Sequence, residues 1–195
     1  PCPSLLMILG IDPGFASMGV AILSDLHREG GSPPLVFSEA TVLRTKKNNN
    51  KVLSWDDNEA RVRYLYRSLN ELIRAYDVKL MAVEAESWTR MPSDKQLGLA
   101  RGAIYGLSEQ WELPIMQVTA VDMKHFLCDN KKASKQDVEE ALSSQYPNLK
   151  ARLNELPRTQ RQHAADAAGC ALYANHHNKW LKLLRRDEAR RQSRS

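Results

Sequence analysis

The sequence predicts an α/β fold in which a mixed sheet of five strands is flanked by helices. Two observations lead to this prediction. Short apolar runs bounded by glycine, proline or polar turns are interspersed with long segments whose apolar residues recur at helical spacing. Along the chain, three strands come first, then a helix, a strand, a second helix, a fifth strand and finally helices only. That order is typical of a sheet covered by helices.

The five predicted strands are apolar runs of strand length. Residues 5–11 form an uninterrupted apolar run that stops at Asp12, and 19–23 follow at hairpin distance. Runs of this kind suit strands that are buried on both faces. Residues 35–43 combine β-branched and aromatic side chains, so three antiparallel strands in succession are the simplest topology. Residues 78–83 and 115–119 are the remaining two strands.

The predicted helices differ in how strongly their sequence patterns indicate them. Residues 55–76 have one apolar face with acids in the first turn, and 94–113 follow as a second helix. Shorter helices are expected at 120–127 and, capped by Ser134, up to about Gln145. We expect 146–161 to be irregular because two prolines interrupt it. The last helix starts near Thr159 and continues towards Leu184.

Two further segments allow two interpretations each. Residues 44–54 form a polar, basic loop with an asparagine run that is not expected to pack, and the loop is either a solvated connector or a phosphate contact. The second helix carries a face of small residues that permits close approach of a neighbouring helix or sheet. They are Gly98, Ala100, Gly102, Ala103 and Gly106.

Composition points to one soluble intracellular domain. The 195 residues suit a single core over 1–184, followed by a basic tail, 185–195, that we expect to be disordered. A net charge of +5 favours a polyanionic partner. Three cysteines without metal-site spacing fit a reducing compartment. The sequence contains neither a recognisable signal peptide nor an apolar run long enough to span a bilayer.

Three acids stand out because each ends or interrupts a segment built to be buried. Asp12 follows the first strand, Glu84 follows the fourth, and Asp166 lies within an alanine-rich stretch of the last helix. His163, three residues earlier, shares a helical face with Asp166. If these groups converge, repulsion between the carboxylates raises a pKa unless a divalent cation is bound.

A carboxylate cluster with one imidazole suits Mg²⁺ or Mn²⁺ better than zinc. Two such ions can stabilise the attacking and leaving oxygens when water cuts a phosphodiester. Each residue also has a simpler interpretation: Asp12 shapes its turn, Glu86 takes the role of Glu84, and His163 caps its helix. The adjacent pair His176 and His177 suits the surface better than a ligand role.

Several motifs together resemble the RuvC family of Holliday junction resolvases, which has an RNase H-like fold. They occur in the family's order and extend from about Leu5 to Ala174. The segments are LGIDPG (9–14), VE (83–84), LGLARG (97–102), ELPI (112–115), DMKHF (122–126), ASKQDV (133–138) and HAADAAGCAL (163–172).

The resemblance implies roles for single residues. Asp12, Glu84 and Asp166 fall on the family's catalytic metal-binding acids. His163 falls where many members have a fourth acid, either as a ligand or as a proton carrier. Lys124 and Lys135 match lysines that bind phosphate and stabilise transition-state charge, although both could simply be solvated.

Two residues are further DNA-binding candidates. Trp88 lies where the family places an aromatic side chain that stacks on an unpaired base, or it merely packs. Lys132 ends a charged loop, 129–132.

The resemblance further implies a Mg²⁺-dependent homodimer that cuts four-way DNA junctions by paired symmetric nicks. The two long helices are candidates for the dimer contact. The basic loop, the 143–161 segment and the arginine-rich tail depart from the family and suggest a divergent or phage-type member. Such a protein is expected in the bacterial or phage-infected cytoplasm, with the nucleoid.

Other functions remain open at this point. They are cleavage of RNA–DNA hybrids or other branched DNA, and a non-catalytic junction-binding module. A sugar kinase or actin-like ATPase would need two lobes and a second phosphate loop, for which the chain has neither the length nor the loop.

Overall fold

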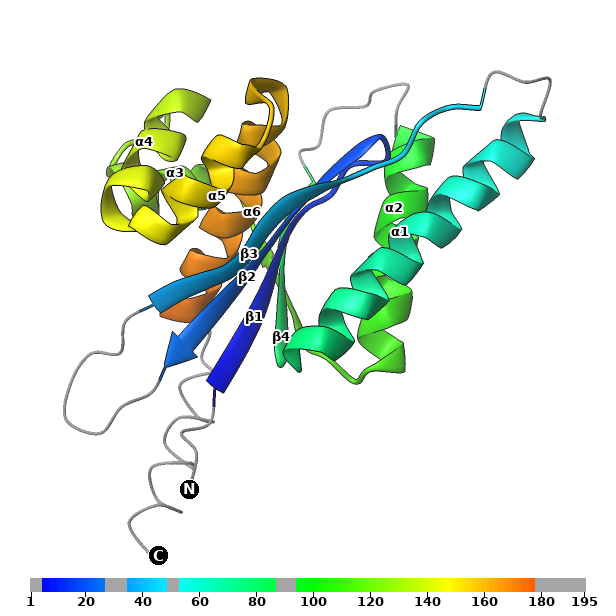
Figure 1. Cartoon of the computed structure of the whole chain (residues 1–195), viewed down its shortest axis with the longest axis horizontal. Coiled ribbons are helices and arrows are strands. Elements are labelled where there is room, and N and C mark those ends of the chain that lie inside the picture. Colours follow the sequence, from blue (N-terminus) through cyan, green and yellow to red (C-terminus); the bar gives the residue numbers. More distant parts are fainter. Residues whose placement is uncertain (1–4, 27–34, 49–52, 87–93, 178–195) are drawn as a thin grey trace, which may run out of the picture.

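The structure, a computed structural model, describes residues 5–26, 35–48, 53–86 and 94–177 (Figure 1). Within these ranges the chain forms five strands and six helices. The strands are β1 Leu5–Asp12, β2 Ser17–Leu26, β3 Leu35–Arg44, β4 Leu80–Glu84 and β5 Ile115–Val118. The helices are α1 Ser54–Tyr76, α2 Asp94–Gln110, α3 Ala120–Cys128, α4 Lys135–Gln145, α5 Pro147–Glu155 and α6 Arg158–His177.

The strands form one mixed sheet in the order β3-β2-β1-β4-β5. β1, β2 and β3 are successively antiparallel, whereas β4 runs parallel to β1 and β5 parallel to β4. The predicted mixed five-stranded sheet is therefore confirmed. Ile11 of β1 pairs with Val83 of β4. Because Asp12 and Glu84 are the next residues, the ends of the two strands bring these acids to the same edge.

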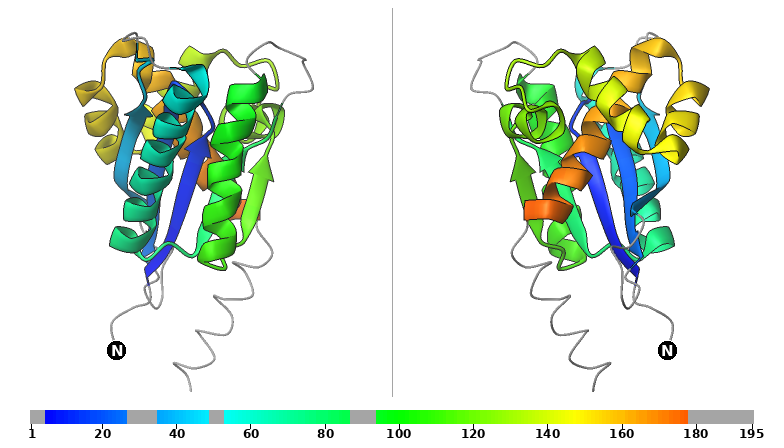
Figure 2. Two further views of the ribbon diagram at one scale, coloured as in Figure 1. Left: turned by 90° about the vertical axis from the view of Figure 1, so that its right-hand side faces the viewer. Right: turned by 90° about the vertical axis from the view of Figure 1, so that its left-hand side faces the viewer.

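Helices cover both faces of the sheet. Figure 2 shows α1 and α2 in front of one face, and α6 with the short helices against the other. The central strand, β1, contributes side chains to the hydrophobic cores on both faces of the sheet, as its uninterrupted apolar run predicts. Ile8 packs into the core under α6, whereas Leu9 and Ile11 pack into the core under α1 and α2, and all three are fully buried.

The two long helices agree closely with the predicted ones. α1 buries Leu65, Leu69 and Ile73 from the apolar face identified in the sequence. α2 ends at Gln110, three residues earlier than expected, since Glu112 adopts a left-handed conformation with φ of 50°. α4 begins as predicted, because Ser134 and Asp137 form a reciprocal capping box.

One sequence expectation is wrong, and two others hold in part. Residues 146–161 are not irregular, because Pro147 starts α5 at a position where proline is favoured, and Leu149 and Leu153 are buried. Of the small-residue face of α2, Ala100 and Ala103 are buried as expected, whereas a Cβ on Gly98 or Gly102 would meet nothing within 4 Å. In the basic loop Thr45 is buried, whereas most of the asparagine run lies outside the described residues.

Other expectations concern the surface and the chain ends. His176 and His177 are exposed near the end of α6, as expected. His177 stacks on Tyr173, and the ring of Phe126 contacts both histidines in tilted or edge-on geometry. Among the described helices, none has the length and apolar character needed to cross a membrane. The tail, 185–195, lies outside the described residues, and the single-domain division stays a prediction.

Candidate active site

Three carboxylates from separate elements meet at one edge of the sheet. Asp12 ends β1, Glu84 ends β4, and Asp166 projects from α6. Each offers a carboxylate oxygen, and these oxygens all lie within 4.8 Å of one another. Asp12 and Glu84 are partly exposed, whereas Asp166 is buried. The convergence predicted from the sequence is therefore observed.

Two strand glycines allow α6 to lie close enough for Asp166 to reach the other acids. A Cβ on Gly10 would lie 2.0 Å from the backbone oxygen of Ala167, and one on Gly19 would lie 1.9 Å from that of His163. The backbone of α6 thus rests directly on β1 and β2. Sequence reasoning noticed the alanines of α6 but missed these glycines. A glycine inside a strand signals such a close approach.

His163 is attached to the cluster through Asp12. Its Nδ1 lies 2.6 Å from Oδ2 of Asp12, so the imidazole N–H donates to the carboxylate. This hydrogen bond raises the pKa of His163 above its usual value, although partial burial opposes the shift. The mutually close ligand atoms belong to the three carboxylates, and His163 lies at their border.

A cavity of about 250 Å³ opens onto the acids. Lys124 from α3 and Lys135 from the start of α4 line it together with Asp12, Glu84, His163 and Asp166. Nζ of Lys135 lies 3.8 Å from Oδ2 of Asp166. The two lysines singled out in the sequence therefore face the same space as the carboxylates.

The remaining candidates lie elsewhere. Lys132 is exposed and does not line the cavity, and Glu86 is exposed and separate from the cluster, which favours Glu84. Trp88 lies outside the described residues.

The electrostatics of the cluster are those of crowded, partly buried acids. Burial, followed by the negative charge of Asp12 and a hydrogen bond to it, raises the pKa of Glu84 to about 8. Burial and the charge of Asp12 raise the pKa of Asp166 to about 6, although Lys135, His163 and Lys124 oppose the shift. The sequence predicted that repulsion between the carboxylates raises a pKa. In the structure, burial is the larger cause of the raised pKa at both Glu84 and Asp166.

This donor set fits a hard divalent cation. Three carboxylates supply only oxygen ligands, and without added positive charge two of them resist ionisation. A bound divalent ion would favour the ionised forms. The cluster is therefore consistent with a metal-dependent site, and its oxygen donors suit Mg²⁺ or Mn²⁺ better than zinc.

A buried arginine supports the strand end that carries Glu84. Arg101 of α2 is 7% exposed, and its Nη2 donates to the backbone oxygen of Glu84 at 2.8 Å. Sequence reasoning included Arg101 in a motif but gave it no role. The available signal was an arginine among the small and apolar residues Ala100, Ala103 and Ile104 of one predicted helix.

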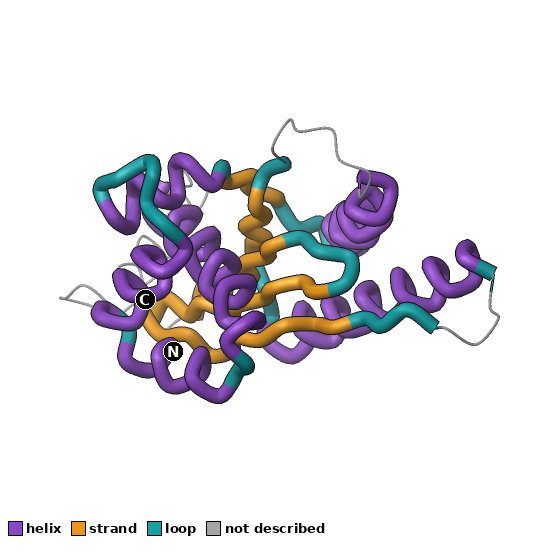
Figure 3. Tube along the Cα trace, turned by 90° about the horizontal axis from the view of Figure 1, so that it is seen from above, coloured by secondary structure: helices purple, strands orange, loops and turns teal. Residues whose placement is uncertain are grey.

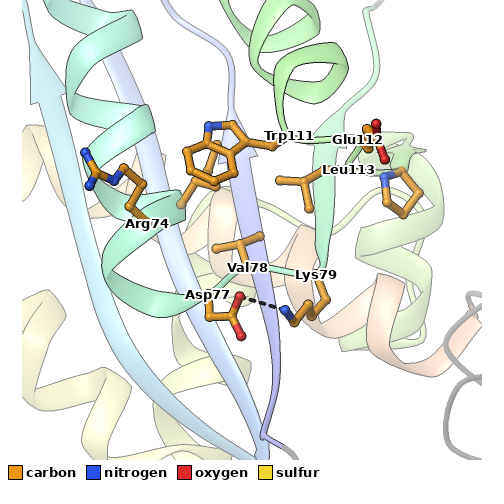
Figure 4. Close-up of a pocket in the computed structure, with 9 residues that line it drawn as sticks. Arg74, Asp77, Val78, Lys79, Trp111, Glu112 and Leu113 are labelled. Atoms are coloured by element: carbon orange, nitrogen blue, oxygen red, sulfur yellow. Dashed lines mark hydrogen bonds and ion pairs between the residues drawn. The ribbon is translucent and has the colours of Figure 1, made fainter.

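A second cavity, of about 480 Å³, lies at the opposite edge of the sheet (Figure 4). It is lined by the ends of α1 and α2 and by the residues before β4 and β5. Its acid Asp77 pairs with Lys79 at 2.6 Å, and Arg74 and Trp111 lie along its rim. It does not combine the acids needed for the chemistry above, and the acidic cluster remains the candidate site.

Comparison with known proteins gives a consistent family. The profile of the family described as crossover junction endodeoxyribonuclease RuvC matches residues 8–174. A crossover junction endodeoxyribonuclease RuvC of Geotalea uraniireducens is 32% identical over 166 residues, which cover 85% of each chain. One from Shewanella sp. (strain ANA-3) is 26% identical over 179 residues, or 91% of each.

Solved structures share the fold. Thermus thermophilus RuvC is similar with a TM-score of 0.68 and 21% identity, covering 86% of this chain and 92% of that one. The same protein in complex with a Holliday junction substrate gives a TM-score of 0.69 at 19% identity, covering 90% and 96%. The yeast mitochondrial resolvase Ydc2 gives 0.61 at 16% identity, covering 94% and 86%. The RNase H-like fold expected from the sequence is thus observed.

Proposed function

This chain belongs to the RuvC family of crossover junction endodeoxyribonucleases, and from that premise we propose how it cuts Holliday junctions. Cleavage takes place at Asp12, Glu84 and Asp166 and consists of paired symmetric nicks that leave 5′-phosphate ends. The observation that carries the proposal is the meeting of these three carboxylates at one edge of the sheet.

We propose that the three acids hold two Mg²⁺ ions, for which Mn²⁺ can substitute. When bound, such ions activate water and neutralise charge on the phosphate that is cut. The contribution of the protein is to fix the carboxylates: Asp12 and Glu84 by strand pairing and Asp166 by the close contact of α6 with the sheet. Arg101 holds the backbone at Glu84.

His163 acts in one of two ways, as a metal ligand or as a proton carrier. Its hydrogen bond from Nδ1 to Asp12 leaves Nε2 as the nitrogen that can bind an ion or exchange a proton. The hydrogen bond to Asp12 raises the pKa of His163 and stabilises its protonated form, which supports the proton carrier.

The basic residues near the acids position DNA. Lys124 and Lys135 line the cavity, where an ammonium group can stabilise charge that develops on the phosphate. Lys132, exposed before α4, would bind the DNA backbone outside the cavity. The stacking role of Trp88 stays a prediction from the family resemblance.

We further propose a homodimer, because two opposed strands of a junction require two sites. The outer face of α2 supports this assembly: Gly98 and Gly102 have open space around them, and Leu99 and Tyr105 are 41% and 42% exposed. Gly102→Glu should therefore shift the sedimentation coefficient to that of a monomer. An unchanged coefficient would exclude this face.

The decisive experiment compares three labelled substrates with and without Mg²⁺: a four-way DNA junction, a linear duplex and an RNA–DNA hybrid. We expect symmetric nicks in the junction only, and none with Asp12→Asn. Hybrid cleavage without junction cleavage would contradict the proposal and favour the alternative nuclease. Junction binding without any cutting would indicate a binding module. Because the proposed substrate is a DNA junction, we expect the protein to act in the bacterial or phage-infected cytoplasm, with the nucleoid.

A further inference from the structure

A short basic segment, residues 44–48, leaves the end of β3 beside the turn that follows Asp12. Arg44, Lys46 and Lys47 are exposed, and none of the ion pairs found within the described residues involves them. The segment adjoins the β1–β2 turn, because the backbone N–H of Thr45 donates to the oxygen of Ala16 at 3.0 Å.

A buried polar network fixes this segment from behind. The hydroxyl of Thr45 donates to the backbone oxygen of Phe15 at 2.6 Å and accepts from Nε of Arg61 at 2.8 Å. The guanidinium of Arg61 lies 4.1 Å from the centre of the Phe15 ring. Asp57 lies 3.5 Å from Nη1 of Arg61 and accepts from the backbone N–H of Asn48 at 2.8 Å.

Such a network is more than a solvated connector needs. Thr45, Asp57 and Arg61 are each at most 9% exposed, and burial of charged groups is unfavourable unless they are paired and hydrogen-bonded. Here the pairing joins three separate parts of the chain: the start of α1, the basic segment and the turn after β1. The network therefore holds the cations of the segment in a fixed position relative to Asp12.

The position of the segment suits DNA that reaches the acidic cluster. β3 runs in the same direction as β1, so Arg44 lies at the sheet edge where Asp12 and Glu84 lie. Viewed from above in Figure 3, the segment extends beyond the sheet towards the start of α1. One duplex arm could thus contact both the basic segment and the acidic cluster.

We propose that Arg44, Lys46 and Lys47 bind backbone phosphates of a junction arm, and that the Thr45–Arg61 network keeps this contact in register with Asp12. The inference rests on the proposed junction cleavage and adds to it a second DNA contact on the β3 side of the acids. Because the network reaches the turn after Asp12, the contact contributes to cleavage as well as to affinity.

The first test measures junction binding across salt concentrations, in the absence of divalent metal. Lys46→Ala/Lys47→Ala should lower the slope of log K against log salt by about 2, since each lost phosphate contact removes roughly one unit. The control, Arg74→Ala/Lys150→Ala, removes the same charge from exposed positions at the far edge and on α5. Its slope should match the parental slope. Equal losses in both variants, or no loss in the first, would overturn the contact.

The second test asks whether the Thr45–Arg61 network couples the position of the basic segment to cleavage. Thr45→Val keeps the shape of the side chain but removes the hydroxyl that joins Arg61 to Phe15, and Thr45→Ser retains it. With saturating junction, Thr45→Val should slow single-turnover cleavage by about tenfold or more, because small misplacements of reacting groups are costly. The parental salt slope should be kept, and Thr45→Ser should restore the rate. Parental cleavage by Thr45→Val would refute the coupling.

The outcomes also separate this inference from the proposed function. If the parental chain neither bound nor cut a four-way junction, both would fail together. If it cut junctions normally while Lys46→Ala/Lys47→Ala retained the parental salt slope, the contact proposed here alone would be wrong.

Discussion

At the level of single residues, Asp166 gives the most direct test of the acidic cluster. Its side chain is buried and lies within 4.8 Å of the other carboxylates, so Asp166→Asn removes a charge with little change of shape. We expect cleavage to fall on the order of a thousandfold, because several kcal/mol of charge stabilisation are lost. Junction binding should be retained, since phosphate contacts dominate it. Single-turnover cleavage and metal-free binding measure the two effects, and cleavage at the parental rate would remove Asp166 from the site.

Lys124 differs from an ordinary DNA-binding lysine by its position in the cavity. If it stabilises charge that develops during cleavage, Lys124→Ala should slow single-turnover cleavage about a hundredfold while weakening binding only a few-fold. Lys132→Ala is the comparison, because this exposed lysine does not line the cavity. That change should affect binding alone. Equal losses of rate and affinity in Lys124→Ala would reduce its role to positioning.

At the level of elements, the contact of α6 with the sheet determines whether the site can form. Gly10→Ala would place a Cβ 2.0 Å from the backbone oxygen of Ala167, so α6 must move away from β1. We expect a loss of stability of about 3 kcal/mol, at the upper end of overpacking costs, together with strongly reduced cleavage.

The control is a second glycine-to-alanine substitution, at a position of α2 where the added Cβ does not clash. Gly106→Ala adds a Cβ at an exposed position of α2, 3.7 Å from the ring of Tyr66, which is an ordinary van der Waals contact, and alanine is the better helix former by about 0.5–1 kcal/mol. Urea unfolding of both variants measures the contrast. A Gly10→Ala protein as stable as Gly106→Ala would mean that α6 does not rest on the strand backbone.

Local sequence patterns were sufficient for most elements. The apolar runs of β1, β4 and β5 and the helical spacing of α1 are properties of neighbouring residues, and these elements were predicted nearly to their ends. α5 was missed because Pro147 was interpreted as a helix breaker, although proline is favoured in the first turn of a helix.

The candidate site also has a part that local sequence patterns predicted and a part that they did not. Asp12, Glu84 and Asp166 were recognisable because an acid within an apolar segment is unusual. The supporting contacts depend on pairs distant in sequence, as between Arg101 and Glu84 or between Arg61 and Thr45. Nothing in the local pattern identifies those partners, so tertiary structure was needed to find them.

At the level of the whole molecule, one edge of the sheet collects both negative and positive groups. The carboxyl ends of β1 and β4 supply two of the acids, and the starts of α4 and α6 supply Lys135 and His163. Concentrated at one place, these charges couple the stability of the fold to pH and to metal ions.

The sign of that coupling follows from the pKa shifts. In the folded protein, the pKa of Glu84 is raised from 4.5 to about 8 and that of Asp166 from 3.8 to about 6. Both acids therefore bind protons more tightly when folded, and this contribution to stability is lost as pH rises through the two windows. His163, whose pKa is also raised, acts in the same direction: its contribution is complete below its unfolded pKa of 6.5 and is lost at higher pH.

We therefore expect these residues to make the metal-free protein less stable at pH 8 than at pH 5, by on the order of 5 °C in Tm. Mg²⁺ should raise Tm more at pH 8 than at pH 5, because a bound cation favours the ionised carboxylates and competes with protons. Glu84→Gln removes the group with the larger shift of the two acids, so it should flatten the pH dependence and weaken the Mg²⁺ effect. Thermal unfolding with chelator or with Mg²⁺ at both pH values measures these differences. If the Mg²⁺ effect were equal at the two pH values and unchanged in Glu84→Gln, the acids would not be competing for protons and metal, and the proposed metal site would be wrong.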